Sequence, residues 1–407
     1  MINTGARNTR ISERSVKRSV KMRRKNLFRM IFGFTMAAVL ILSIPLASSC
    51  AAPGPTPGPT PTPEPTPTPE PTPTPEPATD LPTYDLKMPT IYGPAQVRDF
   101  CQPTVDDIYA ASDGRIKIRV FASGELMPDD QGLAALNSGT IDFLWGIGPN
   151  VATPIDLIDF DCFPPFAWDS SMDLWSMYEY WGLKELWDEA YNELGFVHHG
   201  WLIPTDPIHL LTTKPIQSLD DLDGLKINAD RSVSQCLEHF GAEFVQLPVE
   251  EFYSSGKAGI VDGLVWCGAM EAYTNGWYEA YPYFLANPIN GNARCWIIAR
   301  KDLWESFSEA DKALIDTAFR AAGLRTTIYY WANEPQAREN YTLTYIPDEE
   351  WAEVEEYQYS LWDEWAQETP RLAEFIQILK DYDEFTEMTD WRQYSYHPLK
   401  EGSLYLK

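Results

Sequence analysis

Short apolar runs alternate with longer amphipathic segments between residues 84 and 380, and the stretch 214–266 shows the alternation most clearly. There, the pattern predicts strands at 225–227, 244–247 and 260–263 and helices at 232–240 and 250–257. Val233, Cys236 and Leu237 share one face of the first of these helices. Strand, helix and strand at this spacing indicate parallel α/β units with crossover helices. Ligands of such sheets bind beyond the carboxyl ends of the strands.

The rest of the region repeats this alternation on both sides of the central stretch. Upstream, it predicts strands at 84–90, 116–121, 141–145 and 196–202 and helices at 96–111, 129–137 and 169–193. Downstream, it predicts a strand at 293–299 and helices at 309–339, 347–366 and 371–380. A region of roughly 330 residues is too large for one ordinary hydrophobic core, so two lobes are expected. We predict one lobe from 84–205 and 292–332, and the other from 206–291 and 333–407.

The amino terminus has the features of an export signal. Residues 1–50 hold ten Lys or Arg and one acid, followed by an apolar run at 30–46 and small residues before Cys50. A cysteine after small residues resembles the lipobox of bacterial lipoproteins, which implies a signal peptide at 1–49 and acylation of Cys50. An uncleaved signal anchor is the alternative, since Ala47 stands where that motif usually has Leu. In both cases the remaining chain is expected outside the cytoplasm, anchored to the membrane.

A proline-rich segment follows the signal. Proline occupies every second position from Pro53 to Pro77, and this segment includes three copies of Pro-Thr-Pro-Thr-Pro-Glu. Such a sequence cannot form a packed core and favours polyproline II. At ~3.1 Å per residue it spans up to roughly 75 Å. We therefore predict that residues 50–83 are a spacer between the lipid anchor and the folded region.

Charge and cysteine content exclude some classes of partner. The formal net charge is −27, and the region after residue 50 is more acidic still because the basic residues cluster in the signal. This balance argues against nucleic acid and against an anionic membrane surface as partners. Five further cysteines are scattered, which is not a disulfide framework. Cys236 is expected in the core, and whether Cys267 and Cys295 pair remains open.

Motifs of common catalytic sites are missing from the sequence. It contains no Gly-x-Ser-x-Gly, His-Glu-x-x-His, Walker loop or Cys-x-x-Cys. His198 and His199 lie on a predicted strand, so their rings are expected on opposite faces and not around one metal ion. Asp159 and Asp161 form an isolated Asp-x-Asp, for which a solvated loop is expected rather than a calcium site. No enzyme activity, cofactor or metal site is therefore predicted.

An ordered series of short motifs carries a resemblance to a known family. The series comprises Lys214-Pro215-Ile216, residues 221–227 (DLDGLKI), Leu247-Pro248 with Tyr253, residues 259–263 (GIVDG) and, upstream, 114–118, 123–126 and 136–142. It resembles the DctP family, the extracytoplasmic solute receptors of TRAP transporters, over about residues 84–380. The resemblance implies a two-lobed α/β fold like that of periplasmic binding proteins, with parallel-dominated sheets and a long helix along both lobes.

The family resemblance also implies a function. A small organic solute would be captured in the cleft between the lobes and delivered to the permease subunits of the transporter. A receptor that presents its closed form to a sensor kinase is the alternative. An exported hydrolase is a third possibility, and it lacks a recognisable catalytic set.

The sequence departs from the family at positions that contact the ligand. Members of the family usually place arginines where this chain has Ile208 and Asn228, an aromatic residue at Val249 and an asparagine at Trp266. An arginine grips a carboxylate bidentately, whereas asparagine offers only a neutral donor. Arg231 is a candidate replacement, although a solvent-exposed charge is its more ordinary role. These departures disfavour the usual organic acids as ligands.

Aromatic residues near the predicted strand ends complete the expected site. The predicted ligand-binding set is Tyr92, Trp145, Trp168, Asn228, Arg231, Tyr253 and Trp266. Tyr253 and Trp266 are expected to stack on the ligand, and Asn228 is expected to donate one hydrogen bond. Core packing is the alternative for each aromatic residue. A neutral, aromatic or cationic solute is expected, because aromatic faces attract apolar surface and cations alike.

Overall fold

The computed structural model describes residues 81–151, 153–162 and 164–388, all within the compact unit Glu76–Lys407. The predicted signal peptide, Cys50 and nearly all of the spacer lie outside the described residues. None of the helices in the described part is both long enough and apolar enough to cross a membrane.

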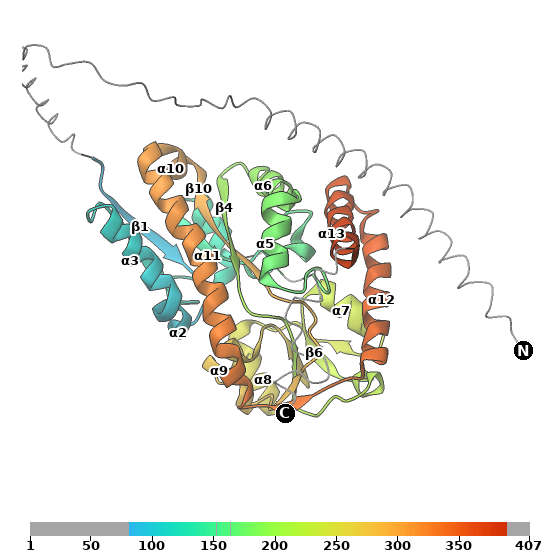
Figure 1. Ribbon diagram of the computed structural model, residues 1–407. Coiled ribbons are helices and arrows are strands. Elements are labelled where there is room, and N and C mark those ends of the chain that lie inside the picture. The colour runs from blue at the N-terminus through green and yellow to red at the C-terminus, as the bar shows by residue number, and fades with distance from the viewer. Residues whose placement is uncertain (1–80, 152, 163, 389–407) are drawn as a thin grey trace, which may run out of the picture. The chain divides into compact units, whose positions relative to one another are not determined.

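Five strands form the first lobe (Figure 1). They are β1 (Tyr84–Pro89), β2 (Ile116–Phe121), β3 (Phe143–Gly146), β4 (Val197–Pro204) and β10 (Arg294–Arg300). β1 and β2 pair in parallel, whereas β10 lies between β3 and β4 and is antiparallel to both. A bridge between Thr90 and Trp145 joins the two sets. All of β3 and nearly all of β10 are buried, which explains their almost continuous apolar sequence.

The second lobe has a six-stranded sheet in the order β11-β9-β5-β8-β6-β7. These strands are β5 (Leu210–Thr212), β6 (Lys226–Asn228), β7 (Glu243–Phe244), β8 (Gly263–Val265), β9 (Tyr283–Leu285) and β11 (Thr342–Thr344). β6 pairs in parallel with β7 and β8, as the central stretch predicts. β5 is antiparallel to β8 and β9. Four of the described strand pairs are parallel and four antiparallel, so the sheets are mixed, not parallel-dominated.

Shorter helices flank the sheets. In the first lobe they are α2 (Pro94–Gln96), α3 (Gln102–Ala111), α4 (Gly132–Asn137), α5 (Ser171–Tyr180), α6 (Leu183–Asn192) and α10 (Lys301–Ser306). In the second lobe they are α7 (Arg231–Glu238), α8 (Phe252–Ala258) and α9 (Ala269–Thr274). A single helix was predicted over 169–193, and this is wrong, because Gly182 adopts a φ of 98° and separates α5 from α6.

One long helix, α11 (Glu309–Arg338), contacts both lobes, which confirms the predicted helix at 309–339 (Figure 1). It packs against β4 and α3 of the first lobe and against α9 of the second. The Ser308 side chain caps its start by accepting a hydrogen bond from the Asp311 amide. A Cβ atom at Gly323 would lie 2.6 Å from the Leu202 carbonyl oxygen. Glycine at this position therefore lets α11 approach β4 closely.

Two helices end the described chain. α12 (Asp348–Trp365) packs on α7 of the second lobe, as expected. α13 (Pro370–Met388) packs on α5 and α6. Assignment of all of 333–407 to the second lobe is therefore wrong for α13, which belongs with the first lobe. Its apolar residues Phe375 and Leu379 are buried there.

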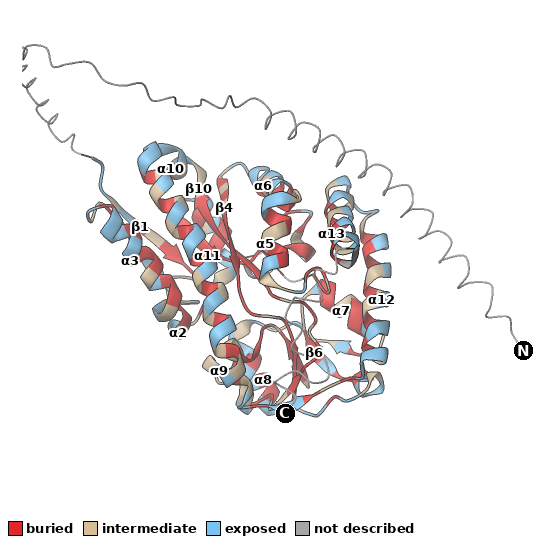
Figure 2. Ribbon diagram, viewed as in Figure 1, coloured by how far each residue is buried: buried red, intermediate tan, exposed pale blue. Residues whose placement is uncertain are grey.

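Burial follows the amphipathic pattern of the sequence, with the crossing strands inside and the outer helix faces exposed (Figure 2). Cys236 is buried on the inner face of α7, which confirms its predicted core position. Cys101, Cys162, Cys236, Cys267 and Cys295 are all buried free thiols. Cys267 and Cys295 are thus not joined in a disulfide.

Candidate solute-binding cleft

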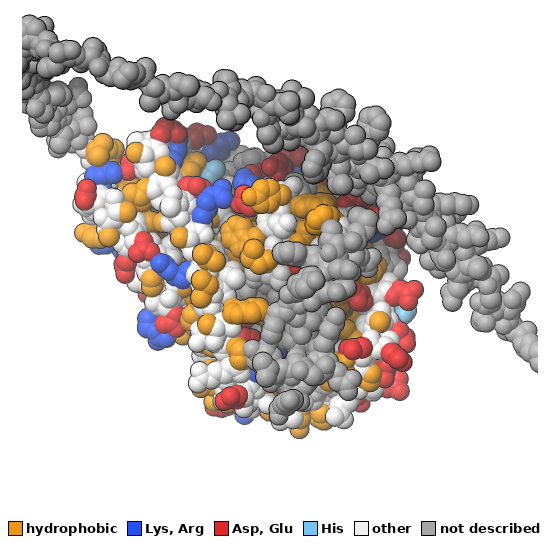
Figure 3. All heavy atoms as spheres, in the orientation of Figure 1, with side chains coloured by type: hydrophobic (Ala, Val, Ile, Leu, Met, Phe, Trp, Pro, Cys, Tyr) orange, Lys and Arg blue, Asp and Glu red, His pale blue; other side chains and the backbone are white. Residues whose placement is uncertain are grey.

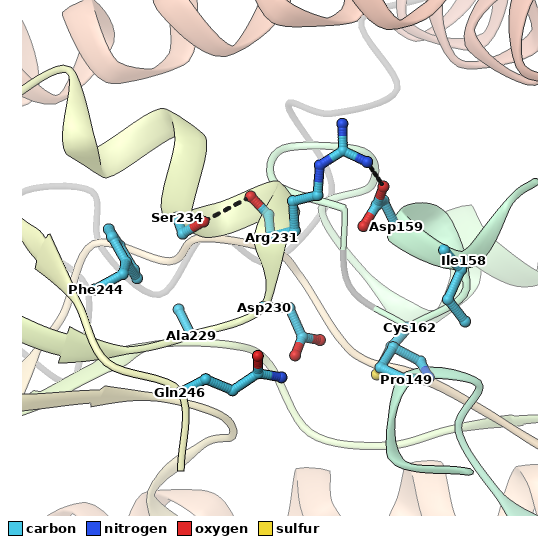
Figure 4. Close-up of a pocket in the computed structure, with 10 residues that line it drawn as sticks. All are labelled: Pro149, Ile158, Asp159, Cys162, Ala229, Asp230, Arg231, Ser234, Phe244 and Gln246. Atoms are coloured by element: carbon cyan, nitrogen blue, oxygen red, sulfur yellow. Dashed lines mark hydrogen bonds and ion pairs between the residues drawn. The ribbon is translucent and has the colours of Figure 1, made fainter. Parts of the chain in front are cut away.

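A pocket of about 360 Å³ lies between the two lobes (Figure 4). The first lobe contributes Pro149, Ile158, Asp159 and Cys162, and the second contributes Ala229, Asp230, Arg231, Ser234, Phe244 and Gln246. Residues 229–231 directly follow β6, and Gln246 lies just after β7. The pocket is therefore at the carboxyl ends of parallel strands, where a ligand site is expected in an open α/β sheet.

An ion pair connects the lobes at this pocket. Arg231 donates a hydrogen bond to Asp159 across the cleft at 2.7 Å, and it lies 3.5 Å from Glu368. Arg231 is half exposed, so solvent screens the pair. Arg231 is the one cationic side chain among the described residues that line the pocket, and its charge is opposed by these two carboxylates.

Asp230 points into the same pocket (Figure 4). It precedes α7 but its side chain makes no capping hydrogen bond. Burial, and then the nearby charge of Asp159, raises the pKa of Asp230 to about 7. A carboxylate in this position gains from a positively charged neighbour, because a cation would offset both the lost hydration and the repulsion.

A cluster of buried acidic groups lies around the crossing strands. Oxygen or sulfur atoms of Asp206, Cys267 and Glu271 lie within 4.8 Å of one another. The Gly268 amide donates to Asp206 at 2.7 Å. Trp266 and Tyr330 each donate to one oxygen of Glu271, at 3.1 Å in both cases. These bonds fix the direction of both carboxyl groups.

The acids of this cluster have no cationic partner among the described residues. Burial raises the pKa of Asp206 well above its ordinary value, and the neighbouring charges of Glu271 and Glu334 add to the effect. Burial also raises the pKa of Glu271. Glu334 differs, because it accepts hydrogen bonds from two amides at the start of α9 and pairs with Arg338 at 2.9 Å. Asp206 and Glu271 are therefore the two acids of the cluster that lack a cationic partner among the described residues. With Cys267 they also form a donor set that could hold a metal ion.

Tyr92 brings a further polar group to this region. Its hydroxyl is buried and has no hydrogen-bond partner within the described part of the chain. The charges of Cys295 and Glu271 contribute to its raised pKa, after burial, so the hydroxyl lies near the acidic cluster. The ring packs edge-on against Trp145 at 6.0 Å. An unpaired buried hydroxyl costs free energy that a polar ligand atom would recover.

The Cys162 thiol lines the first-lobe side of the pocket, and the Cys162 carbonyl accepts from the Arg294 amide, next to Cys295, at 2.7 Å. Burial raises the pKa of the thiol first, and the charges of Cys295 and Asp230 follow as smaller causes. Cys295 is in turn influenced by Glu271 and Asp206. The acidic cluster is separate from the described lining of the pocket, which includes neither Asp206 nor Glu271.

A buried ion pair supports the first-lobe side of the cleft. Arg294 donates to Asp161 at 2.6 Å, and both side chains are fully buried. Asp161 also accepts from the Gly148 amide, Tyr191 and Trp296. Every one of these contacts holds the segment that carries Asp159 and Cys162. The expectation of a solvated loop at Asp161 is thus wrong.

The two histidines contact different partners, as strand alternation predicts. His198 stacks on Trp304, with ring centroids 4.6 Å apart. His199 lies 2.7 Å from Arg294 through Nε2 and 2.6 Å from Asp188 through Nδ1. Because guanidinium only donates, Nε2 accepts and the Nδ1 proton points to Asp188. Burial lowers the pKa of His199, which agrees with a neutral ring.

The structure brings only part of the predicted ligand-binding set together. Trp266 donates to Glu271 of the acidic cluster, Tyr92 packs against Trp145, and Arg231 lines the pocket. Asn228 is buried, and its side-chain oxygen accepts from the Leu247 amide, so it braces the segment after β7.

Two members of the set lie elsewhere. Trp168 donates to the Asn292 carbonyl and faces a different groove, beside α11. Tyr253 is on the exposed surface of α8, where it donates to Glu279. Asp206 and Glu271 were not predicted as site residues, since nothing local distinguishes them from the other acids in the sequence.

A pocket enclosed by two lobes, which crossing strands and one long helix connect, defines a bilobal solute-binding protein. Residues 101–368 match the family of bacterial extracellular solute-binding proteins, family 7 (DctP). The match covers more than half of the chain, and the chain belongs to this family.

Solved structures agree with this assignment. One is a TRAP periplasmic solute-binding protein from Chromohalobacter salexigens with bound (S)-(+)-2-amino-1-propanol. It is 30% identical, with a TM-score of 0.71, over 76% of this chain and 98% of that chain. Another, from Pseudoalteromonas atlantica with bound sodium and pyruvate, is 18% identical, with a TM-score of 0.68, over 77% and 100%. The fold is therefore the two-lobed TRAP receptor fold.

A curated relative from Nostoc sp. is a monocarboxylate 2-oxoacid-binding periplasmic protein. It is 25% identical over 228 residues, which is 49% of this chain. The match spans just over half of that relative, 57% of its length.

Proposed function

We propose that this protein is the solute receptor of a TRAP-type transporter and that its cleft binds a small organic cation. The family and the bilobal fold support the receptor role, and the TRAP relatives favour transport over signalling to a sensor kinase. The protein would act by binding and delivery, without catalysis. Its partners would be the permease subunits, and Cys50 would anchor it outside the cytoplasm through a lipid.

One observation supports a positive charge on the solute. Asp206 and Glu271 have raised pKa values and no cationic partner among the described residues, and Asp230, whose pKa is also raised, points into the pocket between the lobes. Buried carboxylates are costly unless a cation pairs with them. An organic acid would instead add a further negative charge to this region.

The size and polarity of the solute follow from the neighbours. An ammonium group fits between Asp206 and Glu271, where hydrogen bonds already orient Glu271. A hydroxyl on the solute would pair with the Tyr92 hydroxyl, which has no partner in the described structure. The relative from Chromohalobacter salexigens holds a solute with both groups. Short amino alcohols and related amines are therefore the proposed class.

Isothermal titration calorimetry tests the proposal. We expect 2-amino-1-propanol or ethanolamine to bind, and pyruvate and succinate not to bind. Glu271→Gln should weaken amine binding by about 30-fold or more, because loss of one partner of a buried ion pair costs about 2–5 kcal/mol. Glu279→Gln removes a carboxylate outside the cleft and should leave the affinity unchanged.

The pH dependence gives a second readout. Because the pKa values of Asp206 and Glu271 are raised, a cation must displace protons from them at low pH. Amine affinity should therefore fall as the pH decreases, with proton release in calorimetry. Tightest binding of a 2-oxoacid, or tight binding of Ca²⁺ with no effect of amines, would overturn the choice of an organic cation.

A further inference from the structure

A groove separate from the cleft runs beside α11. It has a volume of about 450 Å³, and its apolar lining includes Phe166, Trp168, Pro207, Ile289, Tyr330 and Pro335. None of its lining residues belongs to the pocket between the lobes. It takes residues from the loop before α5, from the segments that cross between lobes, and from α11.

Apolar side chains continue from this groove onto the surface. Leu324, Ile328 and Trp331 of α11 recur at helical spacing and are 57%, 57% and 62% exposed. Met172 at the start of α5 is 66% exposed and also lines the groove. Figure 3 shows hydrophobic side chains gathered over α11 and between it and α5. An apolar surface of this extent next to a groove is typical of a docking site.

The carboxyl-terminal end of the described chain lies next to this surface. Tyr382 of α13 donates to Asp173 in the first turn of α5 at 2.8 Å, and Phe385 packs against Trp181. Ser171 and Met172, which precede Asp173, line the groove. The last described residue, Met388, therefore leaves the helix close to one wall of the groove.

Residues 389–407, which we call the tail, have a composition that suits this groove. They include Trp391, Tyr394, Tyr396, Leu399, Leu404, Tyr405 and Leu406. They also hold three Lys or Arg against two acids, in a chain whose net charge is −27. An apolar segment with a positive balance complements an apolar groove on an acidic body. Fully extended, it could span about 60 Å, which is ample.

We propose that the tail binds along α11 in this groove. Its attachment at Met388 gives it a high effective concentration there, so modest contacts are enough to hold it. Trp168 of the first lobe and Pro207 at the crossing to the second both line the groove. A tail bound in this groove would therefore contact residues of both lobes on the α11 side.

Thiol labelling of the folded protein tests the proposal. Ile328→Cys places a reactive thiol beside the groove, and Ile260→Cys places one at a similarly exposed site in the second lobe. The labelling rate of each introduced thiol is measured in the full chain and in a chain that ends at Met388. Labelling of the same chain without the introduced cysteine is subtracted. If the tail is bound for 90% of the time, the Ile328→Cys thiol should react about tenfold more slowly in the full chain. The Ile260→Cys thiol should react equally in both.

A second variant keeps the test valid if the shortened chain folds poorly. Trp391→Ser, Tyr394→Ser and Leu399→Ser together keep the length and remove the apolar contacts, and should restore fast labelling at position 328. Equal labelling in all chains would overturn the proposal. Protection that persists without the tail and grows with protein concentration would instead assign the surface to a second copy.

Discussion

Asp230→Asn should stabilise the protein at pH 8 and have little effect at pH 4. The pKa of this carboxyl rises from 3.8 to about 7 in the folded protein, first through burial and then through the charge of Asp159. In the unfolded chain it returns to an ordinary value of about 3.9. At a pH between these two pKa values, the Asp230 carboxyl is protonated in the folded protein and ionised in the unfolded chain. Wild-type stability therefore falls as the pH rises through this window.

The expected gain in the free energy of unfolding follows from the pKa shift of Asp230. Each pH unit corresponds to about 1.4 kcal/mol, so the upper bound is about 4 kcal/mol. Asp230 is partly open to the pocket, and solvent reduces the effect to about 2 kcal/mol. Asparagine removes the charge and keeps the shape, so it should recover this free energy at pH 8. At pH 4 the wild-type carboxyl is protonated, and the two proteins should be alike.

Urea unfolding between pH 4 and pH 8 measures the difference. Asp130→Asn removes the same charge from an exposed position and controls for net charge. Asp159→Asn should move the transition to lower pH, because Asp159 raises the pKa of Asp230. A constant loss of stability in Asp230→Asn at every pH would refute the reasoning. It would show that Asp230 caps α7, although the structure gives it no capping hydrogen bond.

Two further predictions concern stability and export. Asp161→Asn should destabilise the protein by about 3–5 kcal/mol in urea unfolding, because it leaves the buried Arg294 without its charge partner. Asp159→Asn, whose partner Arg231 is half exposed, should change stability by less than about 1 kcal/mol at pH 8, and equal losses would contradict this difference. The anchored form should incorporate labelled fatty acid through Cys50, and Cys50→Ala should abolish incorporation; persistent labelling of that variant would exclude this anchor.

The sequence predicts elements well where periodicity and stop signals agree. The central α/β stretch and the 30-residue α11 are examples, because apolar spacing there distinguishes helix from strand. The break at Gly182 was missed because the apolar pattern continues on both sides, and only the left-handed backbone separates the helices. The antiparallel pairing of β5 and β10 was missed because it depends on how the chain crosses between lobes.

From the sequence, only candidate site residues at the ends of predicted strands could be recognised. Tyr92, Trp145 and Trp266 follow or end predicted strands; Trp266 donates to Glu271, and Tyr92 packs against Trp145, but their role in binding stays a prediction. Asp206 and Glu271 are 65 positions apart among 59 acidic residues, and each resembles a surface acid in sequence. Tertiary packing removes their hydration and raises their pKa values, so their chemistry exists only in the folded protein.

Two observations favour a cationic solute over the organic acids that the family usually binds. One is the loss of the two family arginines, and the other is the acidic cluster. Ile208 is fully buried, and Asn228 is engaged with the Leu247 amide, so neither position supplies a cation. Arg231 cannot replace the missing arginines without leaving Asp159, and Asp159 would then add repulsion to Asp230. In the described lining of the pocket, an organic acid would face Asp159 and Asp230, and the guanidinium of Arg231 is already paired with Asp159.

A cation experiences the opposite balance in this cleft. The pKa values of Asp206 and Glu271 in the acidic cluster and of Asp230 in the pocket are raised, so their charged forms are disfavoured in the fold, and a bound positive charge would favour them again. Binding of a cationic solute should therefore stabilise the fold more as the pH rises, because these carboxyls then carry more charge. In the proposed function, the buried carboxyls whose charged forms are disfavoured in the empty receptor would be the groups that select a cationic solute.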